Sequence, residues 1–496
     1  MDHVACLKSR RWRYGDKLRA LRRLRLPPFH VLARHLTPLR RIMTPALSLA
    51  HPRSLPRELL HLAWPSLIAQ LAVMGGGVID TLMAGRISAL DLAAVGIGAS
   101  IYATIFVTVM GVLLALIPVV AHHHGARRFE AIGADVRQSL WLVLALALVA
   151  VLLLKNPEPF LYFAQASPAL EMKVRAYLDG LAWAVPGYLL FRVFYGFTTG
   201  IGRPRPVMIF NLASLALKAP LNWVFMYGHW GLPALGGPGC GWSSAVIAWC
   251  LASAAWYWCR REASYSPYGV FSRFEWPRWP ALKELLRLGV PSGASFLVDV
   301  SAFTFMALFI ARLGPQVSAA HQIAANAAVF MFMVPTALGS ATAVLAGQAL
   351  GAGNSRRSRD AGLLGLGIAA AMGLALGSAM YVGSWVLARA YTPDAAVAAI
   401  AAQLLLLVAA YHLADSVQAV MIQVLRAYKQ TWGPTLIYAV SLWGVGLGGG
   451  YLLGLTDVFG AARGAAGFWL AATLSLAVAS ALTTLYFLRI AKVGKH

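Results

Sequence analysis

Three aspartates lie inside long apolar stretches of this chain, where a carboxylate is costly and is usually kept for a function. Asp80 lies in LAVMGGGVIDTLMAG, Asp299 in GASFLVDVSAFTFM and Asp415 in LLVAAYHLADSVQAVMI. A charged side chain at the centre of a membrane helix costs about 2.5 to 3.5 kcal/mol on insertion scales. A desolvated carboxyl group can bind a proton, a sodium ion or an organic cation, with one occupant disfavouring another. The three aspartates are therefore candidates for cation binding.

The composition places these aspartates in a membrane protein. Of 496 residues, 59% are hydrophobic and 12% are charged, and the mean hydropathy is +0.66. Soluble globular domains have fewer apolar and more charged residues. Apolar runs long enough to cross ~30 Å of hydrocarbon recur between short polar turns. We expect an all-α integral membrane protein with twelve transmembrane helices, near residues 59–83, 92–121, 138–154, 176–201, 206–228, 239–259, 285–311, 316–350, 361–388, 396–425, 432–455 and 464–488.

The net charge of +24 is distributed as a membrane topology requires and not as a nucleic-acid surface. Residues 1–57 contain 14 Lys and Arg against Asp2 and Asp16. If this segment is cytoplasmic, the loops after even-numbered helices and the C-terminus share its side. These loops hold 19 more Lys and Arg, counting Arg137 and Arg426, whereas the opposite loops hold 7. The positive-inside rule therefore predicts that both termini are cytoplasmic, and we expect no nucleic-acid partner.

A repeat with an offset of 226 residues predicts the domain organisation. The segment ELLHLAWP at 58–65 recurs as ELLRLGVP at 284–291, and Gly125 followed by Ala126 recurs as Gly351 followed by Ala352. A unit of six helices enters the membrane from the same side in both copies, and such halves commonly rock about a site between them. We predict two pseudo-symmetric six-helix bundles, with a basic cytoplasmic extension at 1–56, an N-lobe at 57–260, a cytoplasmic linker at 261–283 and a C-lobe at 284–492.

The aspartates do not follow this repeat. Apolar residues stand at the three equivalent positions of the other half, Met306 for Asp80, Val73 for Asp299 and Leu189 for Asp415. The acids are therefore not features of the duplicated scaffold, which favours a functional role. The alternative is a structural ion pair, and for Asp80 the intramembrane cations Lys218 and Arg192 are candidate partners in the same half.

Seven stretches of the chain match one known family when they are taken together in this order. They are VIDTLMAGRISALDLAAVGIGASI (78–101), TGIGRPRPVM (199–208), PLNWVFMYG (220–228), LGGPGCGWSSA (235–245), AAHQIAANA (319–327), ADSVQAV (414–420) and VLRAYK (424–429). From about Leu59 to the end of the last predicted helix, the chain resembles multidrug and toxic compound extrusion (MATE) transporters of the bacterial NorM-like branch. The resemblance implies a two-lobed exporter that exchanges a cytoplasmic cationic drug for an incoming proton or sodium ion.

The same resemblance implies roles for individual residues. Asp80 is similar to the first-helix acid of the N-lobe, a position linked to protons and substrate. Asp299 and Asp415 match the acids of the seventh and tenth helices in the C-lobe. Asn222 matches an Asn on the fifth helix, and Tyr411, one turn before Asp415, matches a Tyr near the cation site of the C-lobe. Carboxylates with a phenol and backbone carbonyls are also hard ligands, so Na⁺ at Asp299 and Asp415 is an alternative to H⁺.

Lys218 departs from the family pattern, because the relatives that align here carry Asn at this position. An ammonium beside Asp80 would repel a second cation and stabilise the ionised carboxylate. We therefore expect Lys218 to modulate Asp80 through an ion pair. Asp299 and Asp415 are then the better candidates for ion coupling.

The resulting expectation is a secondary active antiporter, not an enzyme, that exports cationic or amphipathic compounds across the inner membrane. It would use H⁺ or Na⁺ as coupling ion and no other cofactor, contact membrane lipids, and act as a monomer. One alternative is a flippase for lipid-linked oligosaccharides of the same superfamily, which would need a strongly cationic central cavity. Another is a polytopic membrane enzyme, which would need clustered acids or histidines near a membrane face.

Overall fold

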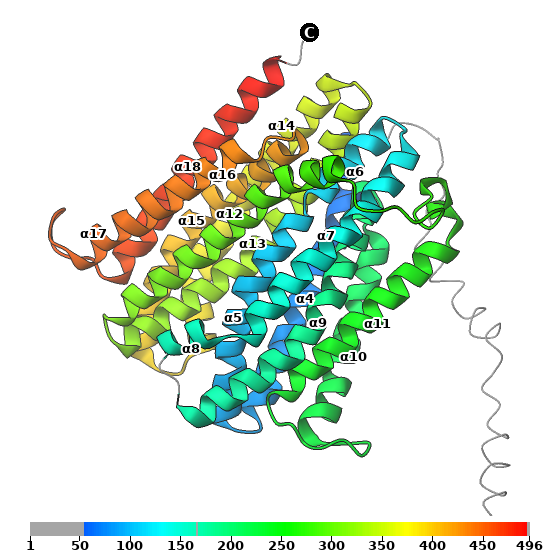
Figure 1. The fold of residues 1–496 in the computed structure, drawn as a ribbon. Coiled ribbons are helices and arrows are strands. Elements are labelled where there is room, and N and C mark those ends of the chain that lie inside the picture. The colour runs from blue at the N-terminus through cyan, green and yellow to red at the C-terminus, as the bar shows by residue number, and fades with distance from the viewer. Residues whose placement is uncertain (1–53, 165–166, 494–496) are drawn as a thin grey trace, which may run out of the picture. The chain divides into compact units, whose positions relative to one another are not determined.

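The computed structural model describes residues 54–493 except 165–166, so the extension predicted at 1–56 falls almost wholly outside them. The described part is helical and contains no strand (Figure 1). Its twelve long helical segments are α4 (Leu55–Gly85), α5 with α6 (Ala89–Leu113, Leu116–Gly125), α7 (Phe129–Lys155), α9 (Pro168–Gly200), α10 (Arg205–Tyr227), α11 (Gly239–Arg261), α12 (Trp279–Ala311), α13 (Pro315–Gly351), α14 (Ser355–Tyr391), α15 (Ala395–Ala427), α16 with η2 and α17 (Trp432–Ala439, Val440–Gly448, Gly449–Leu455) and α18 (Ala465–Val493). Two short helices, α8 (Glu158–Ala164) and η1 (Ala263–Tyr268), lie between them.

Ten of these segments are long and apolar enough to cross a membrane on length and composition alone. The other two are α9 and α11. Helix α9 begins with several charged residues, and nearly all of its last turns are buried inside the protein. A helix that is surrounded by other helices does not need the continuous apolar surface that lipid requires. Twelve spanning segments therefore remain compatible with a weaker hydropathy signal in α9 and α11.

Helix bounds repeat with the offset found in the sequence. Helix α13 covers residues 315–351, and the residues 226 positions earlier, 89–125, are α5 and α6. Helices α9 and α15 correspond within one residue at each end, and α11 and α18 begin at equivalent positions. The predicted all-α membrane fold of two pseudo-symmetric bundles is thus confirmed. We call residues 54–261 and 279–493 the N-terminal and C-terminal halves; the lobe boundaries given above stay predictions.

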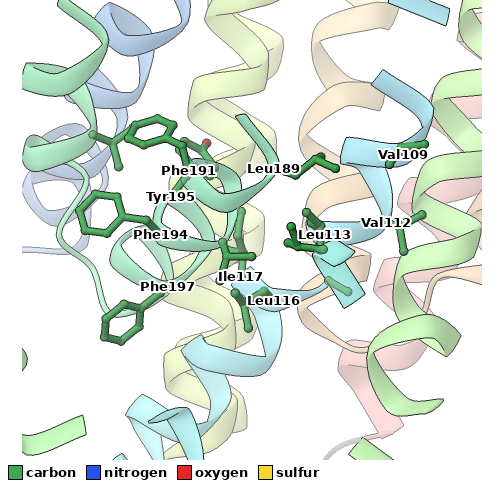
Figure 2. Close-up of a cluster of buried hydrophobic side chains, with 14 of the residues drawn as sticks. Val109, Val112, Leu113, Leu116, Ile117, Leu189, Phe191, Phe194, Tyr195 and Phe197 are labelled. Atoms are coloured by element: carbon green, nitrogen blue, oxygen red, sulfur yellow. The ribbon is translucent and has the colours of Figure 1, made fainter. Parts of the chain in front are cut away.

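The N-terminal half is built around α9, which packs against the junction of α5 and α6. Figure 2 shows this core, with the labelled side chains Val109, Val112, Leu113, Leu116, Ile117, Leu189, Phe191, Phe194, Tyr195 and Phe197. Leu189 is fully buried in it. Leu189 corresponds to Asp415 in the repeat. The same position therefore holds a packed apolar side chain in one half and an acid in the other.

The two halves touch at one end of the helices through a reciprocal contact. A Cβ on Gly125 of α6 would collide with the backbone oxygen of Gln348 on α13, and a Cβ on Gly351 with that of His122. By the offset of 226, His122 corresponds to Gln348 and Gly125 to Gly351. Each glycine therefore receives the partner helix at equivalent positions, and the contact follows the pseudo-twofold symmetry.

Polar contacts reinforce this meeting of the halves, which we call the contact end. Gln348 Nε2 donates a hydrogen bond to the Gly200 oxygen at 2.9 Å. Arg357 Nη2 of α14 lies 2.7 Å from Glu58 Oε2 of α4. The glycines bring α6 and α13 close together, and the two polar contacts join the halves at the same end.

Candidate cation-binding sites

Asp80 is buried in the N-terminal half and is fully partnered. Its side chain projects from the last turns of α4, and the residue is 7% exposed. Lys218 Nζ of α10 lies 3.0 Å from Asp80 Oδ2. Asn222 Nδ2, one turn further along α10, donates to Asp80 Oδ1 at 2.7 Å, and Ser243 of α11 donates in turn to the Asn222 side-chain oxygen. The ion pair of Asp80 with Lys218 that the sequence predicts is present, and Asn222 contacts the same carboxylate; the binding roles of these residues stay predictions.

Lys218 is anchored on its other side by α11. Its ammonium donates to Ser244 Oγ and, at 3.3 Å, to the backbone oxygen of Cys240. With Asp80 these contacts use all three ammonium protons. The acid site of this half therefore already holds a tethered cation.

Arg192, the other candidate partner of Asp80, lies elsewhere. Its guanidinium carbon is 4.2 Å from the centroid of the Tyr195 ring on the same helix. The structure thus selects Lys218 and not Arg192 as the cation beside Asp80.

Asp299 and Asp415 line a single cavity of about 60 Å³ in the C-terminal half. Helix α12 supplies Asp299, and α15 and α16 supply other polar residues, namely Asp415, Gln418, Gln423, Arg426 and Tyr438. Tyr438 donates its hydroxyl proton to Asp299 Oδ1 at 2.7 Å. Asp415 is 5% exposed, and the nearest basic nitrogen recorded for it is His412 Nδ1 at 3.8 Å. The acids of this half share a small space, whereas Asp80 is in direct contact with an ammonium.

The chain matches a known protein family in both of its halves. The family model named MatE matches the chain twice, at residues 65–224 and 291–452. These two matches begin 226 residues apart, as the repeat predicts. The chain belongs to the MATE transporter family.

Relatives and solved structures agree with this assignment. The MATE chain is 39% identical to the probable multidrug resistance protein NorM of Aromatoleum aromaticum, over 86% of its own length and 92% of the relative. It is 38% identical to the multidrug resistance protein PmpM of Pseudomonas aeruginosa, over 90% and 95% of the two chains. A MATE family transporter solved in an outward-facing conformation superposes with a TM-score of 0.80 at 19% identity, covering 88% of this chain and 96% of that one. The multi-pass membrane fold is therefore the MATE fold.

Of the polar residues that line this cavity, the sequence predicts only Asp299 and Asp415; Gln418, Gln423, Arg426 and Tyr438 were missed. The predicted helix 396–425 leaves Arg426 in the following loop, whereas in the structure it lies in the last turn of α15. Its guanidinium carbon is 5.8 Å from the centroid of the Phe296 ring. Helical spacing was the available signal, because positions 415, 418, 422 and 426 share one face of a helix. Tyr438 has no such signal, since it reaches Asp299 from a different helix.

Tyr411 is not among the residues that line the Asp299 and Asp415 cavity. It borders a neighbouring cavity of about 20 Å³ together with Met306, and its ring packs edge-on against Trp469 at 5.6 Å. Its predicted role at the cation site remains a prediction.

The size of the larger cavity limits what it can hold. A volume of about 60 Å³ accommodates a few water molecules or a small ion. Sites for drug-sized molecules are roughly 300 to 1,000 Å³. In the part of the MATE chain that the structure describes, no three His, Cys, Asp or Glu side chains form a metal cluster. A sodium ion bound here would therefore need Tyr438 and amide oxygens in addition to the two carboxylates.

Proposed function

We propose that this MATE protein is a secondary active exporter of cationic or amphipathic compounds, driven by entry of H⁺ or Na⁺. The observation that carries the proposal is the small acidic cavity of Asp299 and Asp415. It has the charge and the size for a coupling ion and is too small for an organic drug. The relatives named as multidrug resistance proteins supply the substrate class.

Coupling follows from the charge of this cavity. When both carboxylates are ionised, Arg426 balances only one of them, so the cavity attracts a further cation. Binding of H⁺ or Na⁺ removes the excess negative charge and changes the stability of the surrounding helices. Because linkage is reciprocal, a conformation that binds the ion more weakly is disfavoured by that ion. The organic substrate then binds outside this cavity, between the halves.

Alternating access would use the contact end described above. Helices α6 and α13 meet there through Gly125 and Gly351, and Glu58 pairs with Arg357 across the halves. Opening this end requires separating the close helix crossings and breaking the Gln348–Gly200 hydrogen bond and one ion pair; an exposed ion pair contributes only about 0 to 1 kcal/mol. Ion binding would then have to shift the balance between this closed arrangement and an open one.

The MATE chain would lie in the inner membrane as a monomer with both termini in the cytoplasm. The excess of Lys and Arg in the loops on that side supports the orientation. A flippase for lipid-linked oligosaccharides fits less well, because Lys218 is neutralised by Asp80 and Arg426 shares its cavity with two acids. The charged residues of the interior therefore do not create a strongly cationic cavity.

Proteoliposomes containing the purified full-length protein test the proposal. Export of an ethidium-like cation would be followed under a pH gradient and, separately, under a sodium gradient at fixed pH. Asp299→Asn and Asp415→Asn are each expected to reduce gradient-driven transport at least tenfold. Asp360→Asn, a change of an exposed aspartate on α14, serves as the matched control.

Two outcomes decide the proposal. Wild-type rates in both Asp299→Asn and Asp415→Asn would show that the cavity does not couple transport. Transport that responds to a sodium gradient at constant pH would identify Na⁺, and a response to the pH gradient alone would identify H⁺.

A further inference from the structure

The segment between the two halves is fastened to the outside of helix α7. Trp141 Nε1 donates to the Glu275 backbone oxygen at 2.9 Å. Gln138 Nε2 donates to the Trp276 backbone oxygen at 3.0 Å, and its side-chain oxygen accepts from the Arg278 backbone N–H at 2.7 Å. These three bonds fix the backbone of residues 275–278 along one turn of α7.

Three aromatic rings gather where this segment crosses α7. The rings of Trp141 and Trp276 stack with centroids 6.1 Å apart, and Phe274 meets both edge-on at 5.9 and 5.4 Å. Phe274 is 71% exposed and Trp276 is 73% exposed. Most of the aromatic surface therefore faces outward, on side chains that their neighbours hold in place.

The aromatic cluster continues a surface that faces lipid. Leu144, Leu148 and Leu152 are 62%, 61% and 53% exposed, and they follow Trp141 on the same face of α7. In a multi-pass membrane protein, exposed leucines along a spanning helix contact the acyl chains. Trp141 stands at the polar end of this stripe, about one turn after Arg137 and Gln138. The cluster thus lies at the depth of the lipid headgroups, where tryptophan is enriched.

Positive charge surrounds the cluster. The Glu275 carboxylate lies 2.8 Å from Arg137, 2.7 Å from Arg273 and 2.9 Å from Arg278. One acid thus holds three guanidinium groups, which leaves an excess of two positive charges. The side chains of Arg273 and Arg278 are 67% and 55% exposed, so their remaining N–H donors face outward. Guanidinium groups match phosphate oxygens with paired hydrogen bonds.

We propose that the segment 273–278, together with Trp141, binds anionic phospholipid headgroups at the membrane surface. The aromatic rings insert at the level of the glycerol backbone, and Arg273 and Arg278 take the phosphate and the extra negative charge. Basic residues near a negatively charged membrane surface are attracted to it. Because this segment connects the halves, a bound lipid would act on the part of the chain that accommodates their relative motion.

Thermal unfolding of the full-length protein in neutral detergent tests this site. Phosphatidylglycerol or phosphatidylcholine would be titrated into the micelles, because a ligand that binds the folded state raises the unfolding midpoint. We expect phosphatidylglycerol to raise the midpoint more than phosphatidylcholine. The double variant Arg273→Ala with Arg278→Ala is expected to lose at least half of this difference, whereas Arg356→Ala, which removes an exposed arginine on α14, should retain it.

The comparison is made within the intact chain, so the basic residues before position 54 contribute equally to every variant. If the double variant is unstable without lipid, Arg273→Ala alone replaces it, because that side chain is the more exposed of the two. An unchanged preference for phosphatidylglycerol in these variants would overturn the proposal. So would an equal loss in Arg356→Ala, because the effect would then report overall charge. Trp276→Ala should weaken the response to both lipids, and a full response in that variant would exclude the aromatic contact.

Discussion

The two halves of this MATE chain share one helical plan but hold their charges in opposite ways. In the N-terminal half, Asp80 is 3.0 Å from the Lys218 ammonium and needs no other cation. In the C-terminal half, Asp299 and Asp415 face a common cavity that Arg426 also lines. The acid site of the N-terminal half is thus occupied by the Lys218 ammonium, whereas the acid site of the C-terminal half has room for a coupling ion. The repeat gives the two halves equivalent positions, and different residues at these positions give each half a different chemistry.

Residues at equivalent positions show how thoroughly the chemistry has diverged. In the C-terminal half, the positions of Asp80, Lys218, Asn222 and Ser243 hold Met306, Gly444, Gly448 and Trp469. Trp469 is fully buried and packs against Tyr411 and Phe303, so a large aromatic side chain stands where the other half has Ser243. The C-terminal segment Val440–Gly448 is also a π-helix, which α10 is not. π-Helical turns often occur at functional sites, and here glycine replaces the polar side chains.

Depth separates the two sites as well. Asp299 corresponds to Val73, which is seven residues before Asp80 on α4. At 1.5 Å per residue, seven residues span roughly 10 Å along the helix. The available acidic cavity is therefore nearer the contact end than the occupied site is. An ion in that cavity is well placed to influence the helices that meet there.

Removing the Lys218 ammonium is expected to lower the stability of the protein more than any other change considered below. Lys218→Met would leave Asp80 buried without its cation, and removing one partner of a buried pair costs about 3 to 5 kcal/mol. Adding Asp80→Asn to Lys218→Met should recover most of the loss. Asp415→Asn should change stability by much less, since no ammonium pairs with that carboxylate. Equal unfolding midpoints for Lys218→Met and Asp415→Asn would contradict the contrast between the halves.

The contact end offers a test where the halves should behave alike. Gly125→Ala and Gly351→Ala each place a methyl group against a backbone oxygen, that of Gln348 or His122. Overpacking of this kind costs about 1 to 3 kcal/mol, and it opposes closure of this end. We expect similar reductions in transport rate from both changes. Gly367→Ala on α14, where a Cβ meets nothing within 4 Å, is the control. A large difference between the two variants would show that the contact is not functionally symmetric.

Tyr438 provides a smaller effect whose direction depends on the coupling ion. Tyr438→Phe removes the hydrogen bond to Asp299, and a bond to a charged group contributes about 1.5 to 3 kcal/mol. If H⁺ drives transport, the ionised carboxylate becomes less stable and half-maximal transport moves to higher pH. If Na⁺ drives it, an oxygen ligand is lost and the half-saturating sodium concentration rises. If neither the pH dependence nor the sodium dependence of transport changes, Asp299 does not take part in coupling. Tyr381→Phe, which changes an exposed tyrosine, is the control.

Most of the fold was predictable from the sequence, because hydropathy and the repeat both act over long stretches. The offset of 226 residues places helix bounds within a residue in several pairs. Details that depend on neighbours were not predictable. Helix α12 begins at Trp279, five residues before the predicted C-lobe, because residues 275–278 are held on α7. The composition of residues 261–283 predicts a linker but does not show that part of it contacts α7.

The candidate sites were predictable in part, for the same physical reason. Charged residues are rare in apolar membrane segments because of their free-energy cost, so Asp80, Lys218, Asp299 and Asp415 can be recognised from the sequence. Their pairing depends on which helices meet, and only the structure places Lys218 beside Asp80 while Arg192 lies on Tyr195. The repeat could not supply this pairing, because neither half retains the polar residues of the other half's acid site.

The smallest expected effect concerns the attachment of the inter-half segment to the N-terminal half. Burial would raise the pKa of Glu275, but hydrogen bonds from Arg137 and Arg273 and the charge of Arg278 outweigh it and lower the pKa. A carboxylate with a lowered pKa stabilises the fold above its unfolded value of about 4.3 and loses this contribution as the pH falls through its folded value.

The Glu275 side chain is 11% exposed, and glutamine keeps an oxygen that can accept hydrogen bonds from the arginines but carries no charge. Glu275→Gln should therefore lower the stability at neutral pH by about 1 kcal/mol, roughly the difference between a hydrogen bond to a charged group and one to a neutral group. The difference from wild type should shrink as the pH falls below about 4, because the wild-type carboxylate is then protonated. Thermal unfolding midpoints over a pH series would measure this convergence, with Glu130→Gln at the exposed start of α7 as control. A difference that stays constant with pH would show that Glu275 fastens the segment by shape alone. The N-terminal half would then carry the segment without using its charge.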